Sequence, residues 1–583
     1  MSVILGINSF HSDSSAALIV DGVLIGAIAE ERLGKRIKHD PSFPINAIRF
    51  LLSHANLKVK DVTHIAIPKN TQVNMFAKMN YTLKNLNTSL PAVKEFFQRK
   101  NKIDNFKNYL EKVFGESSSL FTYRVVNVEH HLAHISSAYY ASEFESKTVG
   151  FSYDGSGDFT SLMLAECEGN KIKIKDRLHL PSSLGFFYTA LCQFIGFEKF
   201  GEEYKVMGLA PYGNDAYKDE MNKLLPIQQN SKWFSLPDKY FKMHSGGECG
   251  ALDSSGHVHM SKIYKESFQD LFGFPRKRTE PINQKQKDIA KSTQLHFERV
   301  LMHCINSAYE LIPSNQIAMA GGCALNGVGN AMILRESPFD KQFIQPAASD
   351  DGTALGAAYW CLFNKVGYKH REIFSPYLGG GYSFSNPSKH FNDSSYEFYE
   401  CLDSNELTYK AASLIADNKV IGWYQGRSEW GPRALGNRSI LANPLTKNMK
   451  DIINLKIKRR ESFRPFAPSI LEEDVSEYFE QTVVSPFMQH VVKFKEKYRG
   501  IFPAVVHVDG TGRLQTVSHK SNPLYYKLIS ELKKVTGHGI ILNTSFNENE
   551  PVVETPQEAI DCFVRTDMDC LCLNNWIISK KNK

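Results

Sequence analysis

The stretch Val128-Glu-His-His-Leu-Ala-His-Ile-Ser-Ser-Ala-Tyr-Tyr140 decides how the rest of the chain is interpreted. A β-branched run leads into it, and small and apolar residues then recur at helical spacing, which predicts a strand followed by a helix. His130 and His134 are four residues apart and so share one face of that helix. Two imidazoles one turn apart can bind one metal ion, although polar residues at a helix start also make ordinary hydrogen bonds. A zinc protease carries Glu directly after its first His, and His131 stands there instead, which disfavours peptide hydrolysis.

Two acidic residues further along the chain are candidates for additional metal ligands. Asp154 follows a predicted strand at 148–153 and opens the glycine-rich turn that ends at Asp158. Asp350 precedes a run of small residues that we expect to be helical. Carboxylates at such positions could complete a site begun by two histidines. An ordinary hairpin turn would explain the first of them equally well, so both interpretations stay open.

The order of elements in the first 370 or so residues favours an α/β class with the actin-like (ASKHA) duplicated fold. Strands are predicted at 3–7, 16–20 and 23–29, a second strand-turn-strand unit begins at 148, and a glycine pair follows a strand at 317–320. That fold closes on a nucleotide between two halves. The pair Gly321-Gly322 would let a flat ring or a sugar lie against the backbone. Phosphotransferases of this fold usually open with an Asp-Gly loop, whereas His11 and Asp13 occupy the first loop here, which disfavours kinase chemistry.

Composition narrows the functional class only a little. The chain has 583 residues and a formal net charge of +7, a mild excess that gives weak support to a nucleic-acid partner. Ten cysteines without a CxxC pair are typical of reduced thiols in the cytosol. The N-terminus lacks the pattern of a signal peptide, and no apolar run is long enough to cross a bilayer. We therefore expect a cytoplasmic enzyme that uses neither nucleic acid nor membrane.

The proline- and glycine-rich stretch Ser375-Pro-Tyr-Leu-Gly-Gly-Gly381 predicts a boundary between domains at 1–374 and 375–583. Beyond it, basic residues are interleaved with aromatics and prolines from 425 to 468. Arginine forks bind phosphate oxygens in pairs, so this cluster favours a polyphosphate site over a purely structural basic surface. Strands are predicted at 505–508 and 539–542, and the second delivers Asn543 and Ser545, which could orient a phosphate or a carbonyl.

Six motifs together resemble one family, the NodU/CmcH-type carbamoyltransferases. They extend from the first domain almost to the C-terminus: Glu129-His-His-Leu-Ala-His, Tyr204-Lys-Val-Met-Gly-Leu-Ala-Pro-Tyr-Gly, Gly321-Gly-Cys-Ala-Leu-Asn, Gly431-Pro-Arg-Ala-Leu-Gly-Asn-Arg-Ser, Phe463-Arg-Pro-Phe-Ala-Pro and Leu542-Asn-Thr-Ser-Phe-Asn. The resemblance implies an actin-like N-terminal domain that transfers the carbamoyl group. It also implies a YrdC-like, twisted-sheet α/β C-terminal domain that forms carbamoyladenylate.

The reaction implied by this resemblance has two stages. Carbamoyl phosphate and ATP give carbamoyladenylate, with release of pyrophosphate and phosphate, and Mg²⁺ screens the triphosphate. The carbamoyl group then passes to a hydroxyl of a small-molecule natural product, and AMP leaves. The resemblance implies that Fe²⁺ or another divalent metal is held by His130, His134, Asp154 and Asp350. A metal at this site would polarise the carbamoyl carbonyl, and His11 is our candidate for the base that takes the acceptor's proton.

Further residues receive a role through the same resemblance. Arg464 is expected to be catalytic in adenylate formation. The residues expected to bind ATP, carbamoyl phosphate or substrate are Lys38, Arg433, Lys458, Arg464, Arg513, Asn543, Ser545, Gly321, Gly322 and Asn326. A homodimer is also expected.

Two other functions compete with this hypothesis. A threonylcarbamoyl transfer to tRNA would favour a strongly basic face, and the net charge is only +7. An actin-like ATPase or binding protein would explain the N-terminal loops but not the arginines and lysines after residue 425. The identity of the acceptor does not follow from the sequence.

Overall fold

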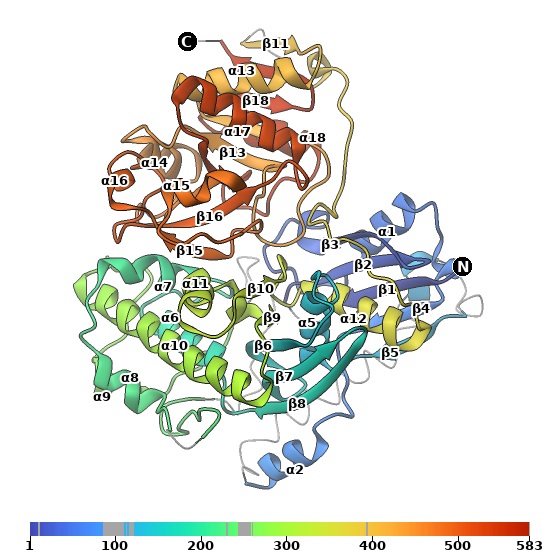
Figure 1. Cartoon of the computed structure of the whole chain (residues 1–583), viewed down its shortest axis with the longest axis vertical. Helices are drawn as coiled ribbons and strands as arrows, with labels where there is room; N and C mark the ends of the chain where they lie inside the picture. The colour runs from blue at the N-terminus through green and yellow to red at the C-terminus, as the bar shows by residue number, and fades with distance from the viewer. Residues whose placement is uncertain are drawn as a thin grey trace. The chain divides into compact units, whose positions relative to one another are not determined.

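The computed structural model describes residues 1–9, 12–84, 110–111, 113–115, 122–228, 231–242, 258, 260–391 and 395–581. They form two compact units, Met1–Phe374 and Ser375–Lys583 (Figure 1). The division falls directly before Ser375, the first residue of the Ser-Pro-Tyr-Leu-Gly-Gly-Gly stretch.

The first unit contains two five-stranded sheets with the same topology. The first sheet has the order β3-β2-β1-β4-β5, and the second has the order β8-β7-β6-β9-β10. In each sheet the first three strands in sequence are antiparallel to one another. A fourth strand pairs in parallel with the first of them, and a fifth pairs in parallel with the fourth. The strands are β1 Val3–Asn8, β2 Ser15–Val20, β3 Val23–Ala29, β4 His64–Ile67, β5 Arg124–Asn127, β6 Thr148–Gly157, β7 Thr160–Glu168, β8 Lys171–His179, β9 Gln316–Ala320 and β10 Lys341–Ile344. This repetition is the duplicated actin-like architecture, which confirms the predicted fold.

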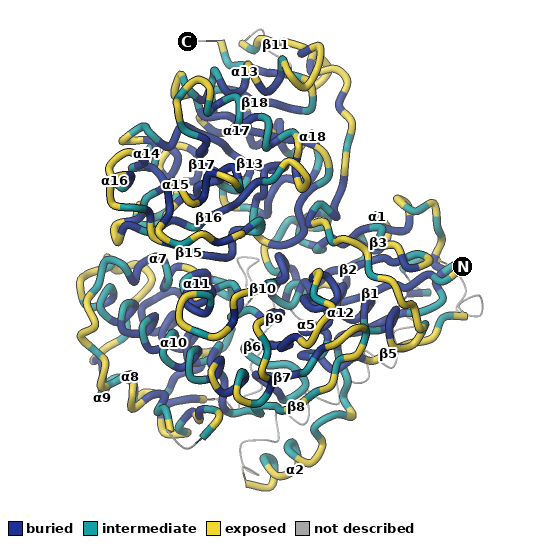
Figure 2. The backbone as a smooth tube through the Cα atoms, viewed as in Figure 1, coloured by how far each residue is buried: buried dark blue, intermediate teal, exposed yellow. Residues whose placement is uncertain are grey.

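Two helices at equivalent places in the two halves meet at the centre of the first unit. Helix α5 (His130–Tyr139) follows β5 and packs on the second sheet, whereas α12 (Gly352–Cys361) follows β10 and packs on the first. Both are almost wholly buried (Figure 2). A Cβ atom at Gly356 would lie 1.8 Å from the carbonyl oxygen of Ala133 on α5, so only glycine permits this close approach. The start of α5 and the loop before α12 are thereby brought together.

The other helices of the first unit are α1 Ile45–His54, α2 Met75–Lys84, α6 Leu184–Phe194, α7 Glu203–Leu209, α8 Lys218–Leu224, α9 Gln269–Phe272, α10 Gln284–Leu311 and α11 Gly327–Glu336. Several of them lie in the insertion between β8 and β9, and α2 lies between β4 and β5 in the chain. Helix α10 packs against α6, α7, α8 and α11. Among the helices of the described residues, none is both long and apolar enough to cross a membrane.

The second unit is an α/β domain built on one mixed sheet with the order β11-β19-β18-β12-β13-β17-β14-β16-β15. Two of its pairings, β12 with β18 and β14 with β16, are parallel, and the others are antiparallel. The strands are β11 Tyr396–Glu400, β12 Ile421–Tyr424, β13 Arg438–Ala442, β14 Ala467–Leu471, β15 His490–Lys493, β16 Thr511–Val517, β17 Ile540–Ser545, β18 Cys570–Leu573 and β19 Trp576–Lys580. The α/β class predicted for this part is confirmed, and its specific likeness to YrdC stays a prediction.

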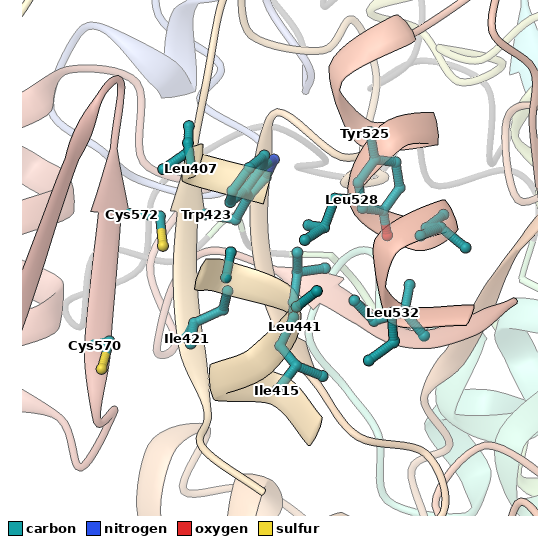
Figure 3. Packing of buried hydrophobic residues seen from close by; sticks show 14 of the residues in the cluster. Leu407, Ile415, Ile421, Trp423, Leu441, Tyr525, Leu528, Leu532, Cys570 and Cys572 are labelled. Carbon is teal, nitrogen blue, oxygen red and sulfur yellow. The ribbon is translucent and has the colours of Figure 1, made fainter. Parts of the chain in front are cut away.

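Helices α13 (Ser404–Ala416) and α17 (Pro523–Thr536) pack against each other and cover one face of this sheet. Figure 3 shows Trp423 and Leu441 of the central strands against Leu528 and Leu532 of α17. Shorter helices lie at α14 Met449–Ile452, α15 Val475–Tyr478 and α16 Glu496–Arg499, and α18 (Pro556–Arg565) packs against β12 and β18. The unit therefore has a hydrophobic core of its own.

Two local predictions differ from the structure. Residues 505–508 contain turns and no strand. The apolar side chains of residues 504 and 505 are buried although they belong to a turn, which leads into β16. The expected turn at 154–158 is shifted, since β6 continues to Gly157 and the chain reverses at Asp158 and Phe159, both with positive φ. Asp154 therefore lies within an extended strand, whose backbone holds its side chain in a fixed direction.

Candidate metal centre and anion-binding residues

Four side chains from three separate elements converge in the first unit. His130 and His134 come from the first turns of α5, Asp154 comes from β6, and Asp350 comes from the loop between β10 and α12. One donor atom of each lies within 4.8 Å of the donor atoms of the other three. Both histidines are buried and the two carboxylates are largely buried. The predicted set of residues is therefore brought together.

The distances between the donor atoms fit one shared cation. The Nε2 atoms of His130 and His134 are 3.1 Å apart, and Nε2 of His134 is 3.1 Å from Oδ2 of Asp154. Oδ1 of Asp350 is 3.3 Å from Nε2 of His130 and 3.4 Å from Nε2 of His134. Donor atoms about 2.1 Å from one metal ion are about 3.0–3.4 Å from one another. Two imidazole nitrogens and two carboxylate oxygens are also donors that divalent transition metals accept.

Electrostatics at the cluster favours positive charge. Burial alone would lower the pKa of His130, but Asp350 and Asp154 outweigh it and raise that pKa to about 10. Burial and Asp350 push the pKa of Asp154 upward, yet its hydrogen bonds to His130 and His134 leave it below its usual value. The carboxylates thus hold a proton on the imidazole of His130, in the place where a divalent cation would interact with the same carboxylates.

A supporting layer fixes the first turn of α5. The backbone N–H of His130 donates to Oδ2 of Asp158 at 2.9 Å. Glu129, which precedes the helix, is buried and accepts two hydrogen bonds from the guanidinium of Arg177, at 2.9 and 2.8 Å. A Cβ at Gly157 would lie 2.0 Å from the ring of His130, so the ring rests directly on that strand. These contacts hold the ring orientation that ligation requires.

His131, between the two candidate ligands, has a structural role. One ring nitrogen lies 2.7 Å from the hydroxyl of Ser152, and the other lies 2.9 Å from the carbonyl oxygen of Thr160. Burial and the neighbouring His130 and His134 lower its pKa well below the usual value. His131 is therefore a neutral imidazole that ties α5 to β6 and β7.

The glycine pair after β9 borders the cluster. Gly321 has φ of +101°, and a Cβ there would lie 2.1 Å from the carbonyl oxygen of Tyr153. A Cβ at Gly322 would lie 3.0 Å from Oδ1 of Asp154. Asn326 is buried, accepts from the backbone N–H of Gly329 at the start of α11, and exchanges two amide hydrogen bonds with Gln294. The structure thus places the glycines beside the cluster and gives Asn326 a helix-capping contact.

Asp13, in the loop between β1 and β2, pairs with His39, in the loop before α1, and sequence reasoning missed this pair. His11 lies outside the described residues, and Lys38 is exposed on the loop before α1. Oδ1 of Asp13, however, lies 2.6 Å from Nδ1 of His39, and Oδ2 accepts from the hydroxyl of Ser349 at 3.1 Å. Ser349 directly precedes the candidate ligand Asp350. No spacing in the sequence predicts this pairing, because its members are 26 and 336 residues apart.

In the second unit, Arg433 and Arg513 come together as predicted. Both side chains are half-buried. Burial first, and the neighbouring charge of Arg433 second, lower the pKa of Arg513 well below its usual value. Two guanidinium groups in one low-dielectric region repel each other, so an anion between them is stabilising. Arg464 is partly exposed, and one nitrogen of its guanidinium lies 3.8 Å from a carboxylate oxygen of Glu461.

The other predicted polar residues of this unit are held by the protein. The ammonium of Lys458 is buried and donates to the backbone carbonyl of Asn547 at 2.8 Å and to its Oδ1 at 2.6 Å. The hydroxyl of Ser545 donates to the same Oδ1 at 2.8 Å. Asn543 is buried and donates to Gln515 at 3.0 Å and to the carbonyl oxygen of Ala434 at 3.1 Å. These side chains organise the end of β17 and the loop that carries Arg433.

Glu429 is a second residue that the sequence did not reveal. Its Oε1 accepts from the backbone N–H groups of Leu435, Asn437 and Arg438 at 2.7, 2.8 and 3.0 Å. The carboxylate therefore shapes the loop that carries Arg433. Arg438, a member of the same motif, is fully buried, stacks 3.7 Å above the ring of Tyr424 and donates to backbone carbonyls, so its role is structural.

The fold and the donor cluster define an actin-like protein with a candidate cation site, joined to an α/β unit with paired arginines. Residues 3–359 match the family model of the carbamoyltransferase N-terminus, and residues 412–580 match that of the carbamoyltransferase C-terminus. The chain therefore belongs to the carbamoyltransferase family and is a carbamoyltransferase, as its motifs predicted.

Relatives cover most of the chain. An uncharacterized protein of Synechocystis sp. is 36% identical over an alignment of 617 positions, gaps included, that covers 100% of this chain and 97% of that protein. Nodulation protein NolNO of Sinorhizobium fredii is 36% identical over 98% of this chain and 80% of its own length. Nodulation protein NolO of Bradyrhizobium diazoefficiens is 38% identical over 78% and 79%. The solved structure of HypF from T. kodakarensis overlaps 64% of this chain and 49% of its own at 13% identity and a TM-score of 0.30, too low to add to the strand-order argument.

Proposed function

We propose that this carbamoyltransferase is ATP-dependent and works in two stages. In the first, the unit Ser375–Lys583 uses carbamoyl phosphate, one water molecule and ATP: water cleaves carbamoyl phosphate to carbamate and phosphate, and the carbamate oxygen displaces pyrophosphate from ATP to form carbamoyladenylate. In the second, the unit Met1–Phe374 transfers the carbamoyl group to the hydroxyl of a small molecule, and AMP is released. The observation that carries the proposal is the buried cluster of His130, His134, Asp154 and Asp350 within the part that matches the N-terminal family model.

The chain's own residues suit both stages. Arg433 and Arg513 provide converging positive charge for a polyphosphate, and Arg464 lies in the same unit with its guanidinium partly exposed. Mg²⁺ would accompany the ATP. In the first unit the cluster would hold a divalent ion, for which we propose Fe²⁺. The chemistry that such an ion supplies when bound is polarisation of a carbonyl oxygen.

The test uses the purified chain with Mg²⁺, ATP and carbamoyl phosphate and without any acceptor. We expect pyrophosphate in solution and carbamoyladenylate by mass spectrometry, and neither product when carbamoyl phosphate is left out. Pyrophosphate that appears with threonine and bicarbonate, but not with carbamoyl phosphate, would instead identify a threonylcarbamoyl enzyme and contradict the proposal.

A further inference from the structure

Asp13 and His39 each have an unusual backbone conformation, and they lie beside the candidate metal ligands. Asp13 has φ of 63° and His39 has φ of 61°, the left-handed region that side chains other than glycine rarely adopt. The side-chain amide of Asn8 donates to the carbonyl oxygen of Asp13 at 2.8 Å, and the backbone N–H of His39 donates to Glu31 at 2.8 Å. Such strain persists where the surrounding contacts fix it, and it is common at ligand-binding sites.

The carboxylate of Asp13 determines how the imidazole of His39 is presented. It is largely buried, with 11% of the side chain exposed, and its two oxygens contact Nδ1 of His39 and the hydroxyl of Ser349. The ring of His39 rests against Gly201, where a Cβ would lie 2.2 Å from Nε2, and meets the ring of Phe200 edge-on at 5.1 Å. Within the described part of the chain, no group forms a hydrogen bond with Nε2, and 32% of the side chain is exposed.

The charges around His39 keep its ring protonated. Burial opposes the charge, but Asp13 outweighs it through its charge and its hydrogen bond, and the pKa rises to about 9. Glu31 adds to the rise, and the neighbouring ammonium of Lys38 opposes it. Glu203 at the start of α7 also interacts electrostatically with the ring. At neutral pH, His39 is therefore an imidazolium beside a lysine, with its Nε2–H available as a donor.

We infer that His39 binds a phosphate group of the nucleotide that carries or has just released the carbamoyl group. An imidazolium N–H forms a short, charge-assisted hydrogen bond with a phosphate oxygen, and Lys38 on the same loop adds a second positive charge. The link from Asp13 to Ser349, the residue before Asp350, sets this donor next to the loop that supplies a candidate metal ligand. The inference rests on the proposed function for its nucleotide, and it adds a binding residue in the transfer unit that no sequence motif predicted.

The test observes the ring of His39 directly in the full chain labelled with ¹⁵N-histidine. Its NMR signal is identified by its loss in His39→Gln, and His370→Gln, at an exposed position in the same unit, is the matched control. We expect a titration midpoint near 9 in the wild-type chain and near 6.5 in Asp13→Asn. Adding AMP at pH 7.5 should shift the His39 signal, inorganic phosphate should shift it less, and adenosine should leave it in place.

Affinity gives a second readout. His39→Gln should weaken the binding of AMP in the first unit by roughly 10- to 100-fold, the effect of losing one charge-assisted hydrogen bond, while His370→Gln should not. A His39 signal that AMP does not move, or that adenosine moves equally, would overturn the inference. A wild-type midpoint near 6.5 would also overturn it and would favour a proton acceptor. Failure of pyrophosphate release with an AMP-dependent shift intact would contradict only the proposed function.

Discussion

At the scale of single residues, the candidate site is defined by the positions of a few charged and ionisable side chains. His130 and His134 lie on one face of α5 because they are four residues apart, and the two aspartates reach them from β6 and from the loop before α12. The sequence was sufficient to predict that these four side chains form one group, because helical spacing and strand ends fix directions locally, and metal binding by the group stays a prediction. It was not sufficient for Asp13 and His39, whose contact depends on two strained loops that meet only in the folded chain.

Removing one donor from the cluster should release the metal. We expect the wild-type chain, reconstituted with Fe²⁺ and dialysed, to retain about one ion per chain by mass spectrometry of the metals. His134→Ala should lose affinity by about tenfold or more, since even changes to residues behind the ligands cost 10- to 100-fold. His370→Gln, at an exposed position in the same unit, should retain the ion. Equal metal content in His134→Ala and the wild-type chain would show that the cluster is not the binding site.

At the scale of elements, the crossing of α5 and α12 builds the cluster. Gly356 allows the two helices to touch, since a Cβ there would lie 1.8 Å from the backbone of α5. The helices then bring together residues 130 and 350, which are 220 positions apart in the chain. A shift of α5 would separate the two histidines from the two aspartates, and a shift of α12 would move Asp350 away from the other three donors, so packing and ligation are coupled.

Gly356→Ala should therefore destabilise the first unit. Overpacking of this kind typically costs about 1–3 kcal/mol, because the helices must move apart. Urea unfolding followed by circular dichroism would measure the loss. Gly500→Ala is the matched control, because nothing lies within 4 Å of a Cβ at that position and the backbone there has a negative φ. An unchanged unfolding midpoint in Gly356→Ala would contradict the described helix contact.

Sequence patterns predicted some of the helices and strands but not all of them. The duplicated strand order followed from alternating hydrophobic runs and turn residues, and both sheets confirm it. Residues 505–508 did not form the expected strand, because an apolar run can be buried from a turn as well as from a sheet. In the basic segment around 458, composition predicts phosphate binding, and that function of Lys458 stays a prediction. The structure adds that its buried ammonium donates to the backbone and side chain of Asn547.

At the scale of the whole molecule, the chain consists of two units with separate cores and separate sets of candidate site residues. The four candidate metal ligands belong to one unit, and the paired arginines belong to the other. Both units match the two parts of one enzyme family, so carbamoyl transfer is a property of the chain as a whole. The proposed mechanism assigns adenylate formation to the second unit and carbamoyl transfer to the first.

One measurement tests this division most directly: the exchange of radiolabelled pyrophosphate into ATP in the presence of carbamoyl phosphate, compared for two variants. Exchange reports adenylate formation alone and needs no acceptor. We predict that Arg464→Ala abolishes the exchange, because it lacks a guanidinium of the adenylate-forming unit. His130→Ala should retain the exchange and fail only in carbamoyl transfer. Loss of the exchange in a folded His130→Ala variant would contradict the assignment of the two stages to two separate sites.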